Sequence, residues 1–263
     1  MRAQLVALVA SHLSDRRRSL LAWGLPLGAM SAFIVAIFPS IESSISKLVE
    51  RYPSGLKEAF GIGELSSVEQ YLHAEMLSLI VPLAVGYLAV RAVSSGLAGA
   101  AETGKLDILL SAPVSRGRLC AAGFLATAIE LAVVLLLTGL LTAAGSLLAG
   151  AGLQAGPAAA GFANVWPLGL LFAGLGVLGC AWSLRTSVVT GAVAGVLVAM
   201  YVIDLVGKLD PSLDWVRYAS VFRYYGNAIE EGIEPLAFIG VGAAGALLAA
   251  LGAWLFGRRD ISG

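Results

Sequence analysis

The chain has 263 residues, of which 58% are hydrophobic and 13% charged, and its formal net charge is zero. A typical soluble domain carries about a quarter charged residues, and one soluble core could not bury this much apolar surface. The composition therefore excludes a soluble globule and a disordered chain, and it indicates a polytopic membrane protein. The balance of 17 basic and 17 acidic residues gives no sign of a nucleic-acid partner.

Metal-binding residue types are scarce. The chain has two cysteines, Cys120 and Cys180, and two histidines, His12 and His73, without the spacing of a zinc or haem site. We expect no metal and no cofactor on this chain, and we expect both cysteines to be reduced, buried and unpaired.

Six apolar stretches are long enough to cross the hydrocarbon core as helices, which takes about 20 residues each. They are Ser19–Phe38, Leu72–Val93, Leu119–Leu148, Trp166–Leu184, Val188–Val206 and Leu236–Phe256. The sequence therefore predicts an all-α protein with six transmembrane helices in a single domain over residues 1–263. The first stretch has no small-residue cleavage site, so we expect a retained span and not a signal peptide.

The distribution of lysine and arginine predicts the orientation, because basic loops stay in the cytoplasm. With six spans both termini share a side. That side has eleven basic residues: Arg2, Arg16, Arg17, Arg18, Arg91, Lys105, Arg116, Arg118, Arg185, Arg258 and Arg259. The other side has six: Lys47, Arg51, Lys57, Lys208, Arg217 and Arg223. We expect both termini in the cytoplasm of a bacterial or archaeal cell, with the chain in the plasma membrane.

An amphipathic segment, Ala3–Leu13, precedes the first span. Leu5, Val9 and Leu13 recur every four residues along it. This spacing predicts an N-terminal helix that lies in the inner membrane interface, and the alternative is a cytosolic extension of the first span.

The loops differ in character. Pro39–Tyr71 is long and predicts a short helix at Leu56–Phe60, whereas Gly150–Ala163 is rich in glycine and alanine and predicts a flexible loop. Ser183–Ser187 is a short turn that pairs the fourth and fifth spans. The aromatic residues of Gly207–Pro235 suit the outer interface, where a re-entrant hairpin is an open possibility.

Two nucleotide-binding patterns fail on inspection. Gly99–Lys105 approaches a Walker A motif, but Leu106 replaces the Ser or Thr that ligates magnesium. Gly174–Gly179 matches the dinucleotide fingerprint but lies inside a span, where small residues let helices approach closely, as at Gly191–Gly195. We therefore expect any ATP to be hydrolysed by another chain.

The cytoplasmic segment between the second and third spans, residues 96–118, has the most informative pattern. Three leucines share one face of a short predicted helix: Leu106, Leu109 and Leu110. Glu102 gives the helix an acidic start, Pro113 ends it, and Arg116 marks the return to the inner surface. An acidic start and an apolar face predict a docking element, with an ordinary interfacial helix as the alternative.

This segment resembles the signature of the ABC-2 type permeases, Glu-x-Gly-x-Leu-Asp/Glu-x-Leu-Leu-x-x-Pro-Val-Ser-Arg. The residues that match are Glu102, Gly104, Leu106, Asp107, Leu109, Leu110, Pro113 and Arg116. Phe60-Gly61, Phe222–Tyr225 and Phe256–Ile261 are similar to the family too, so the likeness covers essentially the whole chain. Ala101 and Lys105 depart from it, because the family often has an acid and a threonine there.

The resemblance implies the membrane subunit of an ATP-binding-cassette exporter, and not an enzyme. Two permeases, identical or sibling chains, would form a dimer in the lipid, and each would dock a separate ATPase subunit that holds ATP and magnesium. The resemblance assigns Glu102 and Asp107 to the ATPase contact. It assigns Phe222, Tyr224 and Tyr225 to an outer gate. The implied cargo is amphipathic, such as a drug, an antibiotic or a lipid-like molecule.

Glu130 lies near the middle of the third span, where a carboxylate costs roughly 3 kcal/mol to insert. We therefore expect it to face protein or a cavity. It is a candidate for the translocation path, and the alternative is a structural contact between helices.

Three other classes of protein are alternatives to the exporter permease. An ion-coupled secondary transporter would use Glu130, but it needs a set of intramembrane acids or broken helices, for which Glu130 is thin support, and the sequence has no evident repeat. An intramembrane enzyme would need convergent catalytic residues inside the spans. Only the docking motif separates the chain from a non-transporting scaffold.

Overall fold

The computed structural model describes residues 2–49, 67–105 and 115–258, and each regular element within these ranges is a helix. The long helices are α2 (Arg17–Val49), α5 (Ile80–Glu102), α7 (Arg116–Ala149), α8 (Ala155–Trp182), α9 (Thr186–Leu209) and α12 (Pro235–Arg258). The short ones are α1 (Arg2–Asp15), α4 (Val68–Leu72), the π-helical turn η1 (His73–Leu77), the 3-10 helix η2 (Pro211–Ala219), α10 (Val221–Tyr225) and α11 (Ala228–Glu231).

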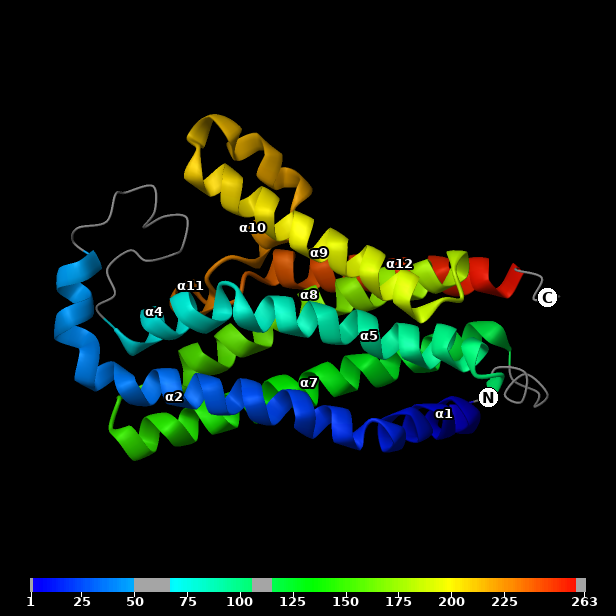
Figure 1. The fold of residues 1–263 in the computed structure, drawn as a ribbon, viewed down its shortest axis with the longest axis horizontal. Coiled ribbons are helices and arrows are strands. Elements are labelled where there is room, and N and C mark those ends of the chain that lie inside the picture. The colour runs from blue at the N-terminus through cyan, green and yellow to red at the C-terminus, as the bar shows by residue number, and fades with distance from the viewer. Residues whose placement is uncertain (1, 50–66, 106–114, 259–263) are drawn as a thin grey trace.

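Six helical stretches of the described residues are long and apolar enough to cross a membrane, which confirms the predicted spans. The second of them, Val68–Glu102, comprises α4, η1 and α5. Figure 1 shows the long helices side by side along the long axis of the molecule, with both termini at the same end. The turn that joins α8 to α9 also lies at this end, which we call the inner end.

The second and fourth spans form the centre of the bundle. In the most apolar 18-residue stretch of each of these two spans, 61% of the stretch is buried, whereas the corresponding share is 22% for α9 and 17% for α12. Leu88 and Leu97 of α5 and Leu168 and Phe172 of α8 are among the fully buried side chains that hold these two helices together. The outer helices leave one face apolar and exposed, as lipid-facing helices do.

Glycines let α8 and α12 approach to backbone contact. A Cβ added to Gly174 would overlap the carbonyl oxygen of Gly245, and one added to Gly252 would lie 2.6 Å from the amide nitrogen of Leu178. The small residues of the fourth span therefore serve helix packing, as predicted. Gly191 and Gly195 of α9 differ, because a Cβ at either would have no neighbour within 4 Å.

Replacing Gly174 by alanine should lower the free energy of unfolding by about 1–3 kcal/mol, because the new methyl group forces α12 away from α8. Gly240→Ala in α12 is the matched control, since it adds the same methyl group where no neighbour lies within 4 Å and should be neutral or slightly stabilising. Thermal unfolding in mild detergent checks both. Equal behaviour of the two variants would contradict the close packing.

One loop prediction needs revision. The flexible loop predicted over residues 150–163 is wrong from Ala155 onward, where α8 begins. Alanine favours helix, and Pro157 lies in the first turn, where its missing N–H is not needed. The helix predicted at 56–60 lies outside the described residues.

The predicted N-terminal helix forms as α1. Figure 1 shows that it continues the direction of α2 and does not cross the bundle, which agrees with the alternative of an extended first span. It packs against α7, and the Arg118 guanidinium donates a hydrogen bond of 3.2 Å to the side chain of Gln4.

Candidate functional site

Only the ends of the predicted docking segment are described. Glu102 is the last residue of α5, Gly104 adopts a positive φ of 69° that favours glycine, and Arg116 begins α7. The remaining predicted residues, Leu106, Asp107, Leu109, Leu110 and Pro113, lie outside the described residues.

The Glu102 carboxylate caps the first turn of α9. One of its oxygens accepts the backbone N–H of Thr186 at 2.9 Å, and the other accepts the Thr186 hydroxyl at 2.8 Å. Deeper in the bundle, the hydroxyl groups of Ser94 and Thr190 lie 2.7 Å apart. Two polar contacts therefore join α5 to α9 at the inner end. The sequence predicted an acidic group at Glu102 but not this partner, which comes from a distant helix.

Glu130 faces protein, as predicted. Its side chain is fully buried and lies 3.1 Å from the Arg16 guanidinium, and Ser19 donates a hydrogen bond of 2.9 Å to it. Arg16 also donates to the Thr127 hydroxyl at 2.8 Å and to the backbone carbonyl of Ala92. This single side chain therefore ties the junction of α1 and α2 to both α7 and α5.

The sequence placed Arg16 among the cytoplasmic basic residues and did not anticipate this ion pair. An available signal was the cost of a carboxylate inside a span, which requires a partner from another helix. His12 lies beside Arg16 at the inner end. Its pKa is lowered, mainly by burial and also by the positive charge of Arg16.

The three predicted gate residues occupy different environments. Phe222 is buried and meets Tyr201 of α9 edge to face, with ring centroids 5.4 Å apart. Tyr224 is exposed. The backbone carbonyl of Tyr225 accepts a hydrogen bond of 2.6 Å from Asn164, about three turns into α8. The chain therefore turns back between the spans at α10, and this burial supports the re-entrant possibility.

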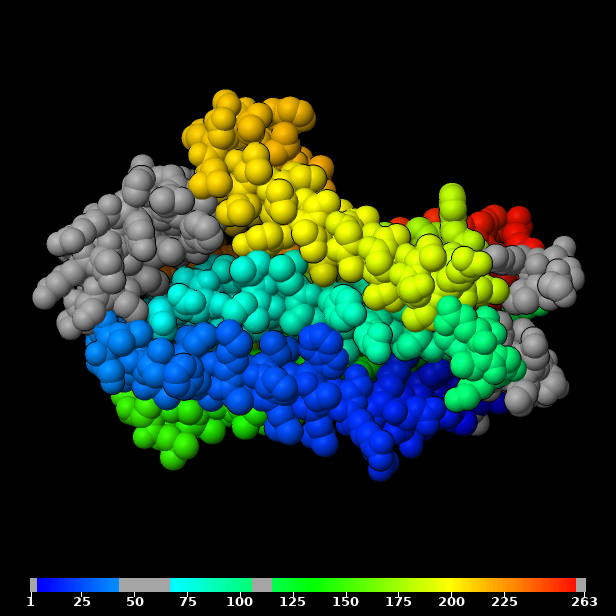
Figure 2. Space-filling model, in the orientation of Figure 1, coloured from blue at the N-terminus to red at the C-terminus, as the bar shows by residue number. Residues whose placement is uncertain are grey.

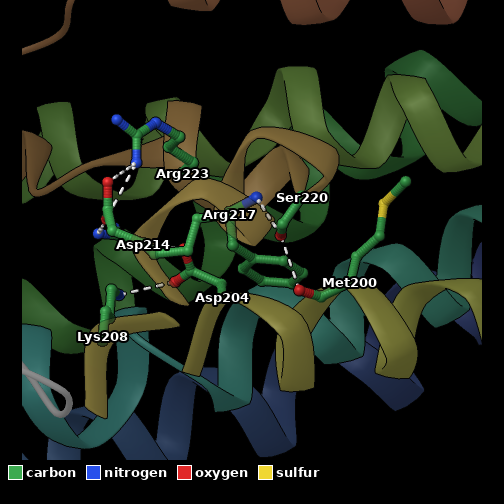
Figure 3. Close-up of polar contacts among 8 residues, drawn as sticks. Met200, Asp204, Lys208, Asp214, Arg217, Ser220 and Arg223 are labelled. Atoms are coloured by element: carbon green, nitrogen blue, oxygen red, sulfur yellow. Dashed lines mark hydrogen bonds and ion pairs between the residues drawn. The ribbon is translucent and has the colours of Figure 1, made fainter. Parts of the chain in front are cut away.

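Ion pairs attach η2 to α9 at the outer end. Asp204 is 2% exposed and lies 2.8 Å from Lys208 and 2.9 Å from Arg217. Asp214 pairs with Arg217 at 2.8 Å and with Arg223 at 3.1 Å. We call Asp204, Lys208, Asp214, Arg217 and Arg223 the outer ion network, and Figure 3 shows these side chains of α9, η2 and α10 close to one another.

Two further contacts support the outer ion network. Gly207 leaves room for Arg217, because a Cβ at Gly207 would overlap that side chain. The Ser220 hydroxyl donates to the backbone carbonyl of Met200 at 2.7 Å, and it also accepts the N–H of Phe222 at the start of α10 (Figure 3).

Acid should loosen the contact between η2 and α10, because the Asp214 carboxylate of η2 pairs with Arg223 of α10. The hydrogen bond from Arg217, together with Arg223, lowers the pKa of Asp214 below its ordinary 3.8, although burial acts in the opposite direction. A carboxyl with a depressed pKa stabilises the folded state above pH 3.8 and loses this contribution as the pH falls through the lowered value. Fluorescence of the neighbouring Trp215 should therefore change below pH 3.8. In Asp214→Asn this step should be absent, and a persisting step would assign the change to another group.

A cavity of about 240 Å³ opens beside the outer ion network. His73 and Ser78 line it from the second span, Tyr201 from α9, and Phe222 and Tyr225 from α10. The second span is interrupted at this level, since η1 is π-helical and Leu79 departs from helical geometry. The sequence predicted a continuous apolar span here, and the local signals of a polar site were His73, Glu75 and Ser78.

No metal site is evident in the described part of the chain. No three His, Cys, Asp or Glu side chains gather as ligands there. Cys120 and Cys180 are buried and free.

Comparison with known proteins gives a family. The family model described as "Multidrug efflux system permease Rv1217c, C-terminal domain" matches residues 7–257, which is nearly the whole chain. A search of the curated proteins finds no match.

Proposed function

The chain belongs to the family of the multidrug efflux system permease C-terminal domain, and we propose that it is the membrane subunit of an ABC-2 type exporter. In this proposal it moves an amphipathic drug, antibiotic or lipid-like molecule out of the cell. A separate ATPase chain binds ATP and magnesium and hydrolyses the ATP.

One observation carries the proposal beyond the family. The docking segment runs from Glu102, where α5 ends, to Arg116, where α7 begins. Figure 1 shows these two helix ends at the inner end of the bundle, where the N- and C-termini of the chain also lie. The segment with the ABC-2 signature is thereby available on one side of the membrane, and we assign that side to the cytoplasm. The excess of lysine and arginine on this side supports the assignment.

The docking surface in this proposal is Asp107 with the apolar face of Leu106, Leu109 and Leu110. Glu102 has a different role, because its carboxylate is bound to Thr186. We assign to it the transfer of movement from the docking segment to α9. ATP binding shifts the equilibrium between two permease conformations only if the ATPase binds one conformation more tightly than the other.

A second permease copy, identical or sibling, is the other partner. Support comes from α9, whose apolar window is only 22% buried. Figures 1 and 2 show its outer half and η2 projecting away from the other helices. The exposed face has valines and the open Gly191 and Gly195, which allow close approach of another helix.

An ion-coupled mechanism through Glu130 gains no support from the geometry. A proton or cation site needs access from water, but Glu130 has no exposed surface and is neutralised by Arg16.

A pull-down from mild-detergent membranes tests the exporter proposal. We expect a soluble ATPase to co-purify with the wild-type chain and with Leu109→Met, which preserves helix and volume. Leu109→Pro should lose it, because proline breaks the docking helix. If no ATPase accompanies the folded wild-type chain, or if Leu109→Pro retains it, the docking proposal fails.

A further inference from the structure

Three neutral polar residues line one cavity at the outer end. His73 is 7% exposed, the side-chain oxygen of Asn227 is buried and unpaired, and Tyr225 lines the same cavity of about 240 Å³, which we call the outer cavity. Burial raises the pKa of Tyr225, so its hydroxyl stays protonated. Buried polar groups in native proteins nearly always have partners, so the unpaired Asn227 oxygen indicates a partner that is absent from the described chain. The His73 imidazole and the Tyr225 hydroxyl belong to residues that line the same cavity and can hydrogen-bond to the same molecule.

The charges around the cavity balance. The outer ion network has three cations and two carboxylates, and Glu231, which also lines the cavity, brings the sum to zero. Each cation of the network already has a carboxylate partner. A ligand with a net charge would therefore remain uncompensated in a partly buried site, whereas a neutral ligand would not.

These three groups specify the chemistry of such a ligand. The Asn227 oxygen only accepts hydrogen bonds, whereas the imidazole and the tyrosine hydroxyl can each donate and accept. Several hydroxyl groups on one molecule can satisfy all three, because each hydroxyl also donates and accepts. The rings of Tyr201 and Phe222 line the same cavity and offer apolar surface for the C–H bonds of a ring.

We propose that the outer cavity binds a neutral, hydroxyl-rich head group, of the class of a sugar ring or polyol. Its position between the interrupted second span and α10 makes it a contact for a molecule at the outer end of the permease. Use of the site during export rests on the proposed function, but binding itself does not require an ATPase.

The test uses the full chain in lipid nanodiscs, without ATPase, so failure of the export proposal would not affect it. Calorimetry measures binding of hexyl β-D-glucoside, with hexyl phosphate and hexylammonium as charged amphiphiles of equal chain length. Methyl β-D-glucoside, which has no alkyl tail, distinguishes a water-soluble ligand from a membrane amphiphile. If the ligand is a free sugar or polyol, the methyl glucoside should bind as well as the hexyl glucoside, and if it is a membrane amphiphile, only the hexyl glucoside should bind. We expect saturable binding of the neutral glucoside and weaker binding of both charged compounds.

Tyr225→Phe is the decisive variant, because it removes only the hydroxyl of this cavity-lining residue. It should weaken binding of the glucoside about three- to tenfold, as loss of one neutral hydrogen bond does, and leave thermal stability unchanged or raised. Tyr218→Phe, at an exposed tyrosine outside the cavity lining, is the matched control and should bind normally. The proposal is overturned if no glucoside binds, if a charged amphiphile binds more tightly, or if Tyr225→Phe binds as the wild type does.

Discussion

Replacing Arg16 by alanine should be among the most damaging single changes in this chain. The substitution removes the cation that neutralises the fully buried Glu130 and leaves Ala92 and Thr127 without their donor. Breaking a buried ion pair from one side typically costs about 3–5 kcal/mol, because the remaining charge is left without compensation. We expect Arg16→Ala to be poorly recovered in folded form and to unfold at a clearly lower temperature in mild detergent.

Arg17→Ala is the matched control, since the neighbouring Arg17 side chain is exposed and its loss should be nearly silent. Replacing both members of the pair, with Arg16→Met and Glu130→Leu together, should recover much of the stability, because an apolar pair leaves no buried charge. A double variant as unstable as Arg16→Ala would show that the ion pair does not explain the loss.

Glu130→Gln separates the structural role from a role in the translocation path. Glutamine keeps the shape of the side chain and one accepting oxygen, which can still accept from Arg16, while the Ser19 hydroxyl can turn to accept from the new amide N–H. Arg16 loses its countercharge, so we expect a folded chain with a lower unfolding temperature. We expect transport to persist. A variant that folds and retains its ATPase but no longer transports would return Glu130 to the translocation path.

The spans could be predicted from sequence because membrane insertion is a property of local composition. About 20 consecutive apolar residues are recognisable without knowledge of their neighbours. The prediction was wrong at residues 155–163, where richness in glycine and alanine suggested a flexible loop but the alanines, with a proline in the first turn, form a helix. The π-helical turn at His73–Leu77, which packs against α8, was missed because no local sequence pattern marks it.

The site residues show the same division. Sequence pattern selected Glu102, Glu130 and Phe222 as unusual for their positions, and the structure gives each of them a specific contact. It could not supply Thr186 or Arg16 as partners, because these are 84 and 114 residues away along the chain. Asn227 also escaped notice, since a polar residue in an outer loop looks ordinary until its oxygen is found buried.

Breaking the contact between Glu102 and Thr186 should uncouple the proposed exporter without releasing its ATPase. Glu102 ends α5, from which the docking segment continues, and its carboxylate binds both the backbone N–H and the hydroxyl of Thr186 at the start of α9. Coupling energies within proteins are about 1–3 kcal/mol, which corresponds to a change of about 5–150-fold. We therefore expect Glu102→Ala and Thr186→Val each to lower the number of molecules transported per ATP within that range.

The two possible roles of Glu102 predict different patterns across the variants. If the carboxylate acts through Thr186, both single variants keep the ATPase bound, and the double variant is no worse than the more severe single one, because both remove the same contact. Thr186→Ser retains the hydroxyl and should couple normally. If Glu102 instead contacts the ATPase, Glu102→Ala alone loses the ATPase from the pull-down, Thr186→Val keeps it, and the effects add. Measurement of bound ATPase and of transport per ATP in the same membranes therefore decides whether movement reaches α9 through this carboxylate.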